Sequence, residues 1–182
     1  EKQECNLGSF DSALVKVSRA GKRAHLIKID VKSAFRLVPI RDEDLPLLCI
    51  KWKSKFYADL KLPFGLRTSP PVWERFSRMI HWVLESEIKG VEVEHYVDDF
   101  LVIVPEGRDS RQVLEQALGI FERLGVPISA NKLCGPDTAV TFLGLGIDTA
   151  EWVICIPPEK VRKAMELLET MKQRKKVRRS FV

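Results

Sequence analysis

The adjacent acids Asp98 and Asp99 are the first feature of the sequence that could carry chemistry. Two acids at the tip of a hairpin are usually turn formers in water. Apolar residues on both sides, Tyr96-Val97 and Phe100–Val104, predict that this hairpin is held in the centre of a sheet. Carboxylates fixed side by side repel each other unless a cation neutralises them. Hard divalent cations, Mg²⁺ above all, prefer such oxygen ligands, so the pair predicts a metal site.

A third acid, Asp30, ends the apolar run Leu26–Ile29. An acid at the end of a buried strand can simply cap the helix that follows. If the strand lies beside the acidic hairpin, Asp30 would complete a two-metal cluster. Such a cluster supports in-line phosphoryl displacement, because the attacking and the leaving oxygens both need positive charge nearby. The spacing in the sequence leaves both interpretations open.

A loop over residues 62–71, Leu-Pro-Phe-Gly-Leu-Arg-Thr-Ser-Pro-Pro, leads into a helix with Trp73 and Phe76 on its apolar stripe. Gly65 would let a backbone or a flat ligand approach closely. The loop is therefore a candidate for binding a planar group, although many loops before helices look similar.

The elements that must position these residues follow from periodicity. Helices are expected over residues 70–90, 109–124 and from 157 onwards, with a weaker one over 12–20. Strands are expected over 25–31, 47–53, 56–62, 91–96, 100–104, 141–147 and 152–156. The apolar stripe of the last helix, Val161, Met165, Leu168 and Met171, is expected to face the core. This mixture predicts an α+β fold with an antiparallel sheet and helices packed on one face.

Composition sets the remaining bounds. The 182 residues suffice for one compact domain, and no apolar run is long enough to predict a membrane span. Of the net charge of +5, residues 172–182 supply +6, so the rest of the chain carries −1. The basicity thus belongs to the tail, more typical of a solvated helix end than of a specific site. Four scattered cysteines indicate a reducing, intracellular compartment and are expected to be small buried residues.

Five segments, in this order, resemble motifs of reverse transcriptases. Asp30–Phe35 resembles the first polymerase motif, Leu62–Pro70 the second, and Tyr96–Asp99 the YxDD box. Lys132 fits the lysine of a fourth motif, and Phe142–Gly144 fits the primer-grip segment. One such match would be weak, whereas five in order are highly specific. The residues in and around these motifs look most like those of reverse transcriptases from DIRS-like retrotransposons, with gypsy-type elements close behind.

The resemblance implies a metal site in the catalytic palm of a polymerase. Asp30, Asp98 and Asp99, with the backbone carbonyl of Val31, would bind two Mg²⁺ ions, for which Mn²⁺ could substitute. Lys132 would lie near the triphosphate and protonate the leaving pyrophosphate; the alternative is a solvated lysine.

The resemblance also implies substrate contacts. Phe35 would be the aromatic gate that selects deoxynucleotides, while Phe64, Gly65 and Arg67 would line the incoming nucleotide and the template base. The primer end would be positioned by Phe142, Leu143 and Gly144. Phe35 and Phe142 fit equally well as core aromatics if the motifs are ignored.

The implied activity is RNA-directed DNA polymerase, with an RNA or DNA template, a DNA primer and dNTPs as partners and no membrane. Residues 1–182 are expected to form a single domain, a palm with partial fingers, without thumb or RNase H. The sequence does not predict the oligomeric state. The alternative function is a catalytically impaired retroelement remnant that binds nucleic acid or a protein.

Overall fold

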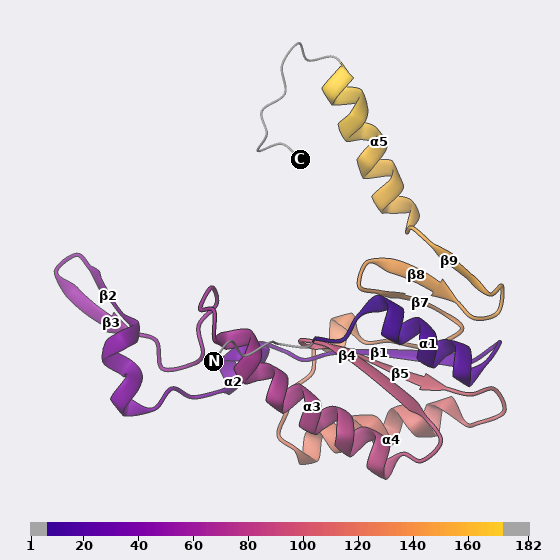
Figure 1. Ribbon diagram of the computed structural model, residues 1–182, viewed down its shortest axis with the longest axis horizontal. Helices are drawn as coiled ribbons and strands as arrows, with labels where there is room; N and C mark the ends of the chain where they lie inside the picture. Colours follow the sequence, from indigo (N-terminus) through magenta and orange to yellow (C-terminus); the bar gives the residue numbers. More distant parts are fainter. Residues whose placement is uncertain (1–6, 173–182) are drawn as a thin grey trace.

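A four-stranded antiparallel sheet with the strand order β4-β5-β1-β6 forms the centre of the protein (Figure 1). The computed structural model describes residues 7–172. The strands are β1 (His25–Asp30), β4 (Glu92–Tyr96), β5 (Asp99–Val104) and β6 (Cys134–Asp137). The inner strands β1 and β5 are adjacent, which brings two distant parts of the sequence side by side.

Two long helices cover one face of this sheet. Side chains alternate along a strand, so Ile27, Ile29 and Val102 point to the same side. There they pack with the apolar stripes of α3 (Ser69–Glu87) and α4 (Ser110–Arg123), which lie together below the sheet in Figure 1. This larger core confirms the predicted α+β arrangement, and both helices match their predicted ranges closely.

The opposite face carries a smaller core. Leu26 and Leu101 pack there with α1 (Phe10–Ala20) and with Phe142 of a second, three-stranded sheet. This sheet has the order β7-β8-β9 and consists of β7 (Ala139–Phe142), β8 (Leu145–Asp148) and β9 (Val153–Cys155). The predicted N-terminal helix is thus confirmed, and it lies across the sheet from α3 and α4.

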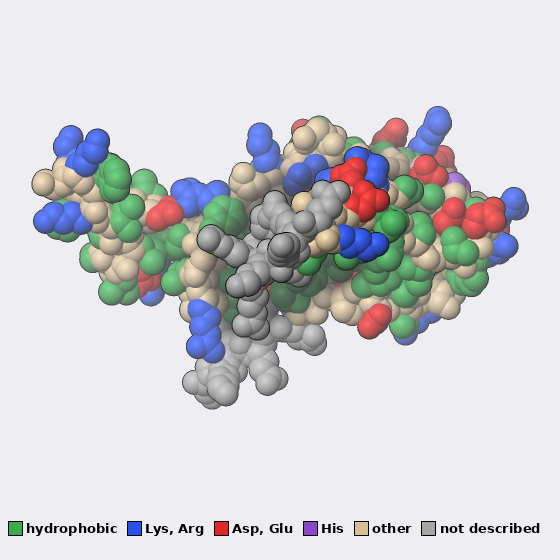
Figure 2. All heavy atoms as spheres, turned by 90° about the horizontal axis from the view of Figure 1, so that it is seen from above, with side chains coloured by type: hydrophobic (Ala, Val, Ile, Leu, Met, Phe, Trp, Pro, Cys, Tyr) green, Lys and Arg blue, Asp and Glu red, His purple; other side chains and the backbone are tan. Residues whose placement is uncertain are grey.

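One part of the chain projects away from both cores. It comprises the 3-10 helix η1 (Asp42–Leu48) and the hairpin of β2 (Cys49–Trp52) and β3 (Lys55–Ala58). The short helix α2 (Ala34–Leu37) precedes it and packs against the larger core. Every residue of the two strands is exposed, and basic side chains stand out at this end of the molecule (Figure 2). A lone two-stranded hairpin is only marginally stable, so its support must come from what it contacts.

The predicted strand over residues 141–147 is wrong, because the structure divides this range between β7 and β8. Leu143 and Gly144 have φ angles of 47° and 83°, which makes a two-residue turn of the hairpin type. The short strand β6 was not predicted either. It contains Gly135 and Pro136, residues that strands usually avoid.

Two burial predictions are also wrong. The last helix, α5 (Pro158–Lys172), points away from the body in Figure 1 and has no buried residue. Its stripe Val161, Met165 and Leu168 is therefore about half exposed instead of lying in the core. Cys49, Cys134 and Cys155 are exposed free thiols, and Cys5 lies outside the described residues.

In the part of the chain that the structure describes, we find no helix that combines the length and the apolar character needed to cross a membrane.

Candidate functional site

The acidic hairpin turns through two residues, Val97 and Asp98, between Tyr96 and Asp99, which pair across β4 and β5. We call residues 96–99 the carboxylate turn. Val97 has a φ of 57°, although hairpin turns with a positive φ at this position normally carry glycine. A β-branched residue in this conformation costs about 1–3 kcal/mol and persists only when its surroundings hold it there.

Helix α3 provides this support. The carbonyl oxygen of Val97 accepts a hydrogen bond from Trp73 Nε1 at 2.8 Å and another from Ser77 Oγ at 2.6 Å. Both donors are buried. The next carbonyl, that of Asp98, accepts a bond of 2.9 Å from the backbone N–H of Val31. The turn is thus tied to α3 on one side and to the end of β1 on the other.

The strand pairing places two of the three predicted acids opposite each other, and the third lies in the adjacent turn. Asp30 and Asp99 are direct partners across β1 and β5, so both side chains point to the same face of the sheet. Asp98 immediately precedes Asp99 in the turn and lines the same cavity as Asp30. The two regions are far apart in the sequence, and this pairing is what the sequence alone left open.

Two lysines balance much of the negative charge. Lys132, on the 3-10 helix η2 (Ala130–Lys132), donates to both carboxylate oxygens of Asp30, at 2.9 and 3.2 Å. Lys28 Nζ lies 3.2 Å from Asp99 Oδ1. That oxygen is buried, and the contact lacks the geometry of a hydrogen bond. Three carboxylates therefore face two ammonium groups.

The remaining charge falls on Asp98. Its pKa is raised by burial, and the neighbouring carboxylates of Asp99 and Asp30 raise it further against the opposing effects of a backbone hydrogen bond and Lys132. The pKa of Lys132 is also raised, mainly by its hydrogen bond to Asp30. Lys132 is thus a cation at neutral pH, whereas Asp98 is the acid that a further positive charge would stabilise most.

A cavity of about 390 Å³ opens in front of these groups. Its lining includes Asp30, Asp98 and Lys132, together with the aromatic residues Phe35 and Phe64, which the resemblance assigned to substrate contacts. The centres of the two rings are 5.3 Å apart, and Phe64 is 73% exposed. Phe35 also contacts the larger core, which agrees with the alternative of a core aromatic, and its role as a gate stays a prediction.

The loop before α3 brings only some of its predicted residues to this cavity. Ser69 Oγ donates to the carbonyl of Pro63 at 2.6 Å and closes the loop. Gly65 has a φ of 82°, and open space surrounds the position that a side chain would take. Arg67 is exposed and is not among the residues that line the cavity.

The predicted primer-grip residues lie in the turn between β7 and β8. Phe142 is fully buried in the smaller core, so its side chain can act on a ligand only by fixing this turn. Leu143 and Gly144 form the turn itself, and the Gly144 carbonyl accepts a bond of 2.9 Å from Lys160 Nζ.

Sequence reasoning missed the side of α3 that contacts the carboxylate turn. Helical spacing predicts Trp73 as a core residue, and it is 2% exposed, yet its ring N–H contacts the carboxylate turn. Ser77 carried no prediction. A Trp and a Ser four residues apart lie on one face of a helix, and both have a donor that needs a partner when buried. That spacing is the signal that could have identified them.

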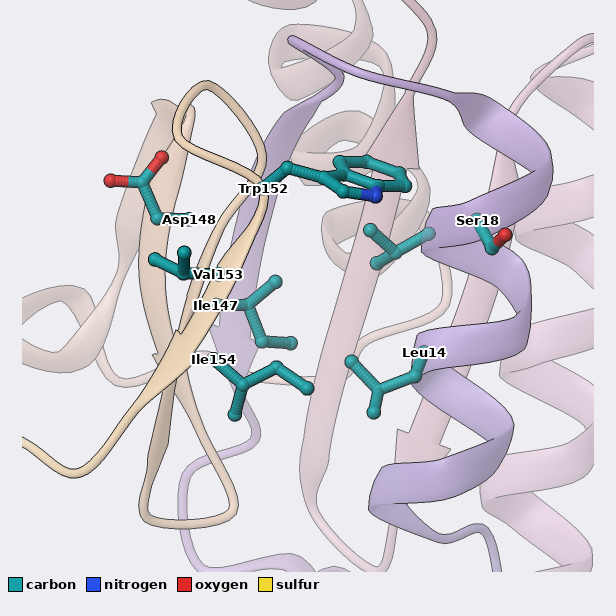
Figure 3. A pocket seen from close by; sticks show the side chains of 8 residues that line it. Leu14, Ser18, Ile147, Asp148, Trp152, Val153 and Ile154 are labelled. Carbon is teal, nitrogen blue, oxygen red and sulfur yellow. The ribbon is translucent and has the colours of Figure 1, made fainter.

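A second hollow, of about 230 Å³, lies away from the acids, between α1 and the β8–β9 hairpin (Figure 3). Leu14, Ile147 and Ile154 give it apolar walls, and the ring of Trp152 reaches across towards α1. Asp148 points away from it and accepts hydrogen bonds from two backbone N–H groups of its own turn. The hollow therefore offers no group for the chemistry expected at the acids.

The carboxylate site offers the oxygen ligands that a hard divalent cation prefers. The buried Oδ1 of Asp99 without a hydrogen bond and the raised pKa of Asp98 both fit a cation there. Among residues 7–172, however, no three acidic, histidine or cysteine side chains converge closely enough to enclose an ion. Lys132 and Lys28 hold two of the three acids in ion pairs instead.

Comparison with known proteins gives a consistent result. Residues 4–147 match the family model described as reverse transcriptase (RNA-dependent DNA polymerase). The chain is 29% identical over 147 residues to the retrovirus-related Pol polyprotein from transposon opus of Drosophila melanogaster. That match covers 81% of this chain and 14% of the relative. Polyprotein P3 of Commelina yellow mottle virus is 27% identical over 133 residues, which cover 72% of this chain and 7% of that protein.

Solved structures show the same fold. The foamy viral protease-reverse transcriptase in complex with an RNA/DNA hybrid superposes with a TM-score of 0.66 at 23% identity. The superposition covers 79% of this chain and 18% of the other. The foamy viral protease-reverse transcriptase dRH in complex with double-stranded DNA gives a TM-score of 0.65 at 23% identity over 79% of this chain and 24% of that one. The chain thus spans a small part of each protein that it matches.

Proposed function

The chain belongs to the reverse transcriptase (RNA-dependent DNA polymerase) family, and from this membership we propose that it forms the palm, with part of the fingers, of such a polymerase. The reaction is attack of a primer 3′-hydroxyl on the α-phosphate of a dNTP. The observation that carries the proposal is the direct pairing of Asp30 with Asp99, beside Asp98 in a turn that opens onto a cavity with Lys132.

Reverse transcriptases generally use divalent metal ions. We propose two Mg²⁺ ions, replaceable by Mn²⁺, with Asp30, Asp98, Asp99 and the Val31 carbonyl as ligands. Bound ions supply positive charge to the attacking and leaving oxygens of an in-line displacement. The unpaired charge on Asp98 and the buried oxygen of Asp99 support this ligand set.

The other residues bind and orient the substrates. The side chain of Lys132 is 58% exposed. Its ammonium group can therefore reach a phosphate in the cavity and deliver its proton to the leaving pyrophosphate. The ring of Phe35 faces the sugar, and Phe64, Gly65 and Arg67 lie towards the base. The turn Leu143-Gly144, fixed by Phe142, positions the primer end. Holding reactants in line supplies much of the rate of such a reaction.

Nucleic acids are the proposed partners: an RNA or DNA template and a DNA primer. Among the foamy viral structures, one contains an RNA/DNA hybrid and two contain double-stranded DNA, which supports this assignment. The source in a DIRS-like or gypsy-type element, and a site of action inside the cell, remain part of the proposal.

One observation favours a second candidate, a catalytically impaired module that binds nucleic acid or a protein. The ion pairs of Lys132 with Asp30 and of Lys28 with Asp99 stabilise the described arrangement without a metal ion. In such a module the acids would be structural, and binding would persist without nucleotide transfer.

Primer extension on an RNA template with Mg²⁺ separates the two candidates. We expect the polymerase to extend the primer and Asp98→Asn to lose more than about 100-fold of the rate, the scale seen when one preorganised electrostatic group is removed. Asp11→Asn, on the exposed surface of α1, is the matched control and should extend normally. Equal extension by Asp98→Asn would contradict the proposed site, whereas binding of primer–template without extension would support the binding module.

A further inference from the structure

We propose that Trp73 and Ser77 are positioning residues that hold the carboxylate turn in its left-handed conformation through the Val97 carbonyl. The inference rests on the proposed function, because it assigns to α3 the task of aiming the acids. Neither residue touches the cavity in front of the acids, whose lining includes Val97 and Asp98 but no residue of α3.

The contact is built from two donors on one helix face. Trp73 and Ser77 are one helical turn apart, and both reach the same oxygen, at 2.8 and 2.6 Å. Ser77 is fully buried, and Trp73 is nearly so. A hydrogen bond in a buried setting is electrostatically stronger than in water, and its loss leaves a buried polar group without a partner. Two buried donors on one carbonyl therefore fix its direction firmly.

This carbonyl needs fixing because of where it lies. Val97 takes a φ of 57° at a turn position that favours glycine, so the turn would relax without outside support. The Val97 carbonyl also belongs to the peptide unit that carries the amide of Asp98. A rotation of this unit would change the direction of the Asp98 side chain relative to Asp30 and Asp99. Since a functional site must be held within about 0.5 Å of its working geometry, the two donors on α3 are part of the polymerase site.

The helix supplies matched controls. Trp82 and Ser86 also lie on α3, and Trp82 is 68% exposed. Trp82→Phe and Ser86→Ala make the same chemical changes as Trp73→Phe and Ser77→Ala, away from the carboxylate turn. A general effect of such changes on the helix would therefore appear in both pairs.

The sequence also supplies a direct spectroscopic readout. Val97-Asp98 is the one place where aspartate follows valine. A chain labelled with ¹³C at valine carbonyls and ¹⁵N at aspartate therefore gives a single carbonyl–amide cross-peak. We expect this peak to move in Trp73→Phe and in Ser77→Ala, to move further in the double variant, and to stay in place in both controls. An unmoved peak in the folded double variant would overturn the contact.

Metal binding and kinetics test the consequence of the contact. Mn²⁺ binding, followed by electron paramagnetic resonance of the free ion, should weaken about tenfold in each variant, as expected when the support of a metal ligand is removed. Extension should lose kcat with little change in the KM for dNTP. A moved cross-peak with unchanged Mn²⁺ affinity and kcat would overturn the positioning role. If the unaltered chain binds no Mn²⁺, the proposed function fails, while the cross-peak still decides whether α3 holds the turn.

Discussion

Phe35 lines the same cavity as Asp30 and Asp98, and the centre of its ring lies 5.3 Å from that of the exposed ring of Phe64. A smaller side chain there would leave room for a sugar 2′-hydroxyl. We expect Phe35→Val to reduce the discrimination against ribonucleotides by about tenfold or more, the effect of a few missing carbons in a pocket. The measurement is the ratio of kcat/KM for dNTP and rNTP. Phe56→Val, on the exposed hairpin, is the control, and unchanged sugar selectivity in Phe35→Val would contradict the gate.

A second residue, His81, should make the fold sensitive to pH. Its Nδ1 lies 2.7 Å from Nδ1 of His95, the residue just before the carboxylate turn. Burial lowers the pKa of His81 below 6.5, and the charge of Lys16 and the nearby His95 lower it further, whereas Glu85 opposes them. Three other residues contact His95 directly: Glu74 through the ring nitrogen Nε2, Glu94 through the backbone N–H, and Phe100 through ring stacking. Glu74 also forms an ion pair with Arg78.

The sign of the effect follows from proton uptake. Below pH 6.5 the unfolded chain protonates His81, while the folded chain resists protonation until the pH is lower still. The unfolded state thus binds more protons in this window, so the free energy of unfolding should fall as the pH decreases. Urea unfolding at pH 7.5 and 5.5 measures this loss. It should be smaller in His81→Gln, and an equal loss in both proteins would exclude His81 as the source.

At the residue scale, five of the residues that the sequence indicated line one cavity: Asp30, Asp98, Lys132, Phe35 and Phe64. They could be indicated because carboxylates, lysine and aromatic residues have distinctive chemistry in a fixed order, and their roles stay predictions. The sequence could not predict which groups neutralise the acids. Lys28 and Lys132 lie far apart in the sequence and meet the acids only through the strand pairing. The support of the turn by Trp73 and Ser77 depends on the same tertiary contacts.

At the scale of elements, α5 gives the clearest difference between pattern and structure. Its stripe has the spacing of a core-facing helix, but none of its residues is buried. We therefore expect Leu168→Gln to change the free energy of unfolding by no more than about 0.5 kcal/mol, as is usual for surface changes. Ile80→Ala, on the buried stripe of α3, should cost about 2–5 kcal/mol.

Urea unfolding of both variants makes this comparison. A cost for Leu168→Gln similar to that for Ile80→Ala would mean that another surface covers the stripe in solution. Periodicity predicts that a helix has an apolar face, but it does not identify what covers that face. For α3 and α4 the cover is the central sheet, whereas α5 has no such neighbour among the described residues.

At the scale of the whole molecule, the charge distribution governs binding to nucleic acid. The chain outside residues 172–182 carries a net charge of −1, and local basicity is found at the β2–β3 hairpin with Lys51, Lys53 and Lys55. We expect weak primer–template binding that falls steeply between low and moderate salt, because counterion release would drive it. The chain shortened to residue 172 should bind more weakly, with a smaller dependence on salt.

Fluorescence anisotropy of a labelled primer–template at several salt concentrations gives both quantities. Tight binding that does not respond to salt would contradict this prediction.

The α+β fold and the order of the motifs could be predicted, because each motif is local in the sequence. The separation into two cores and the projection of the β2–β3 hairpin could not be predicted from the sequence, because both depend on which strands lie side by side.

The position of β1 between β5 and β6 has a consequence for the nascent chain during its synthesis on the ribosome. Leu26 pairs with Ile103 on one side and with Asp137 on the other, so β1 leaves the ribosome long before either neighbour. At about 5–20 residues per second, the interval until both neighbours exist is on the order of ten seconds. Throughout that time at least one edge of β1 has no partner strand for its backbone N–H and C=O groups. Asp30 and Asp99 thus meet only late in synthesis, and the unpaired edge of the nascent strand depends on protection from aggregation until then.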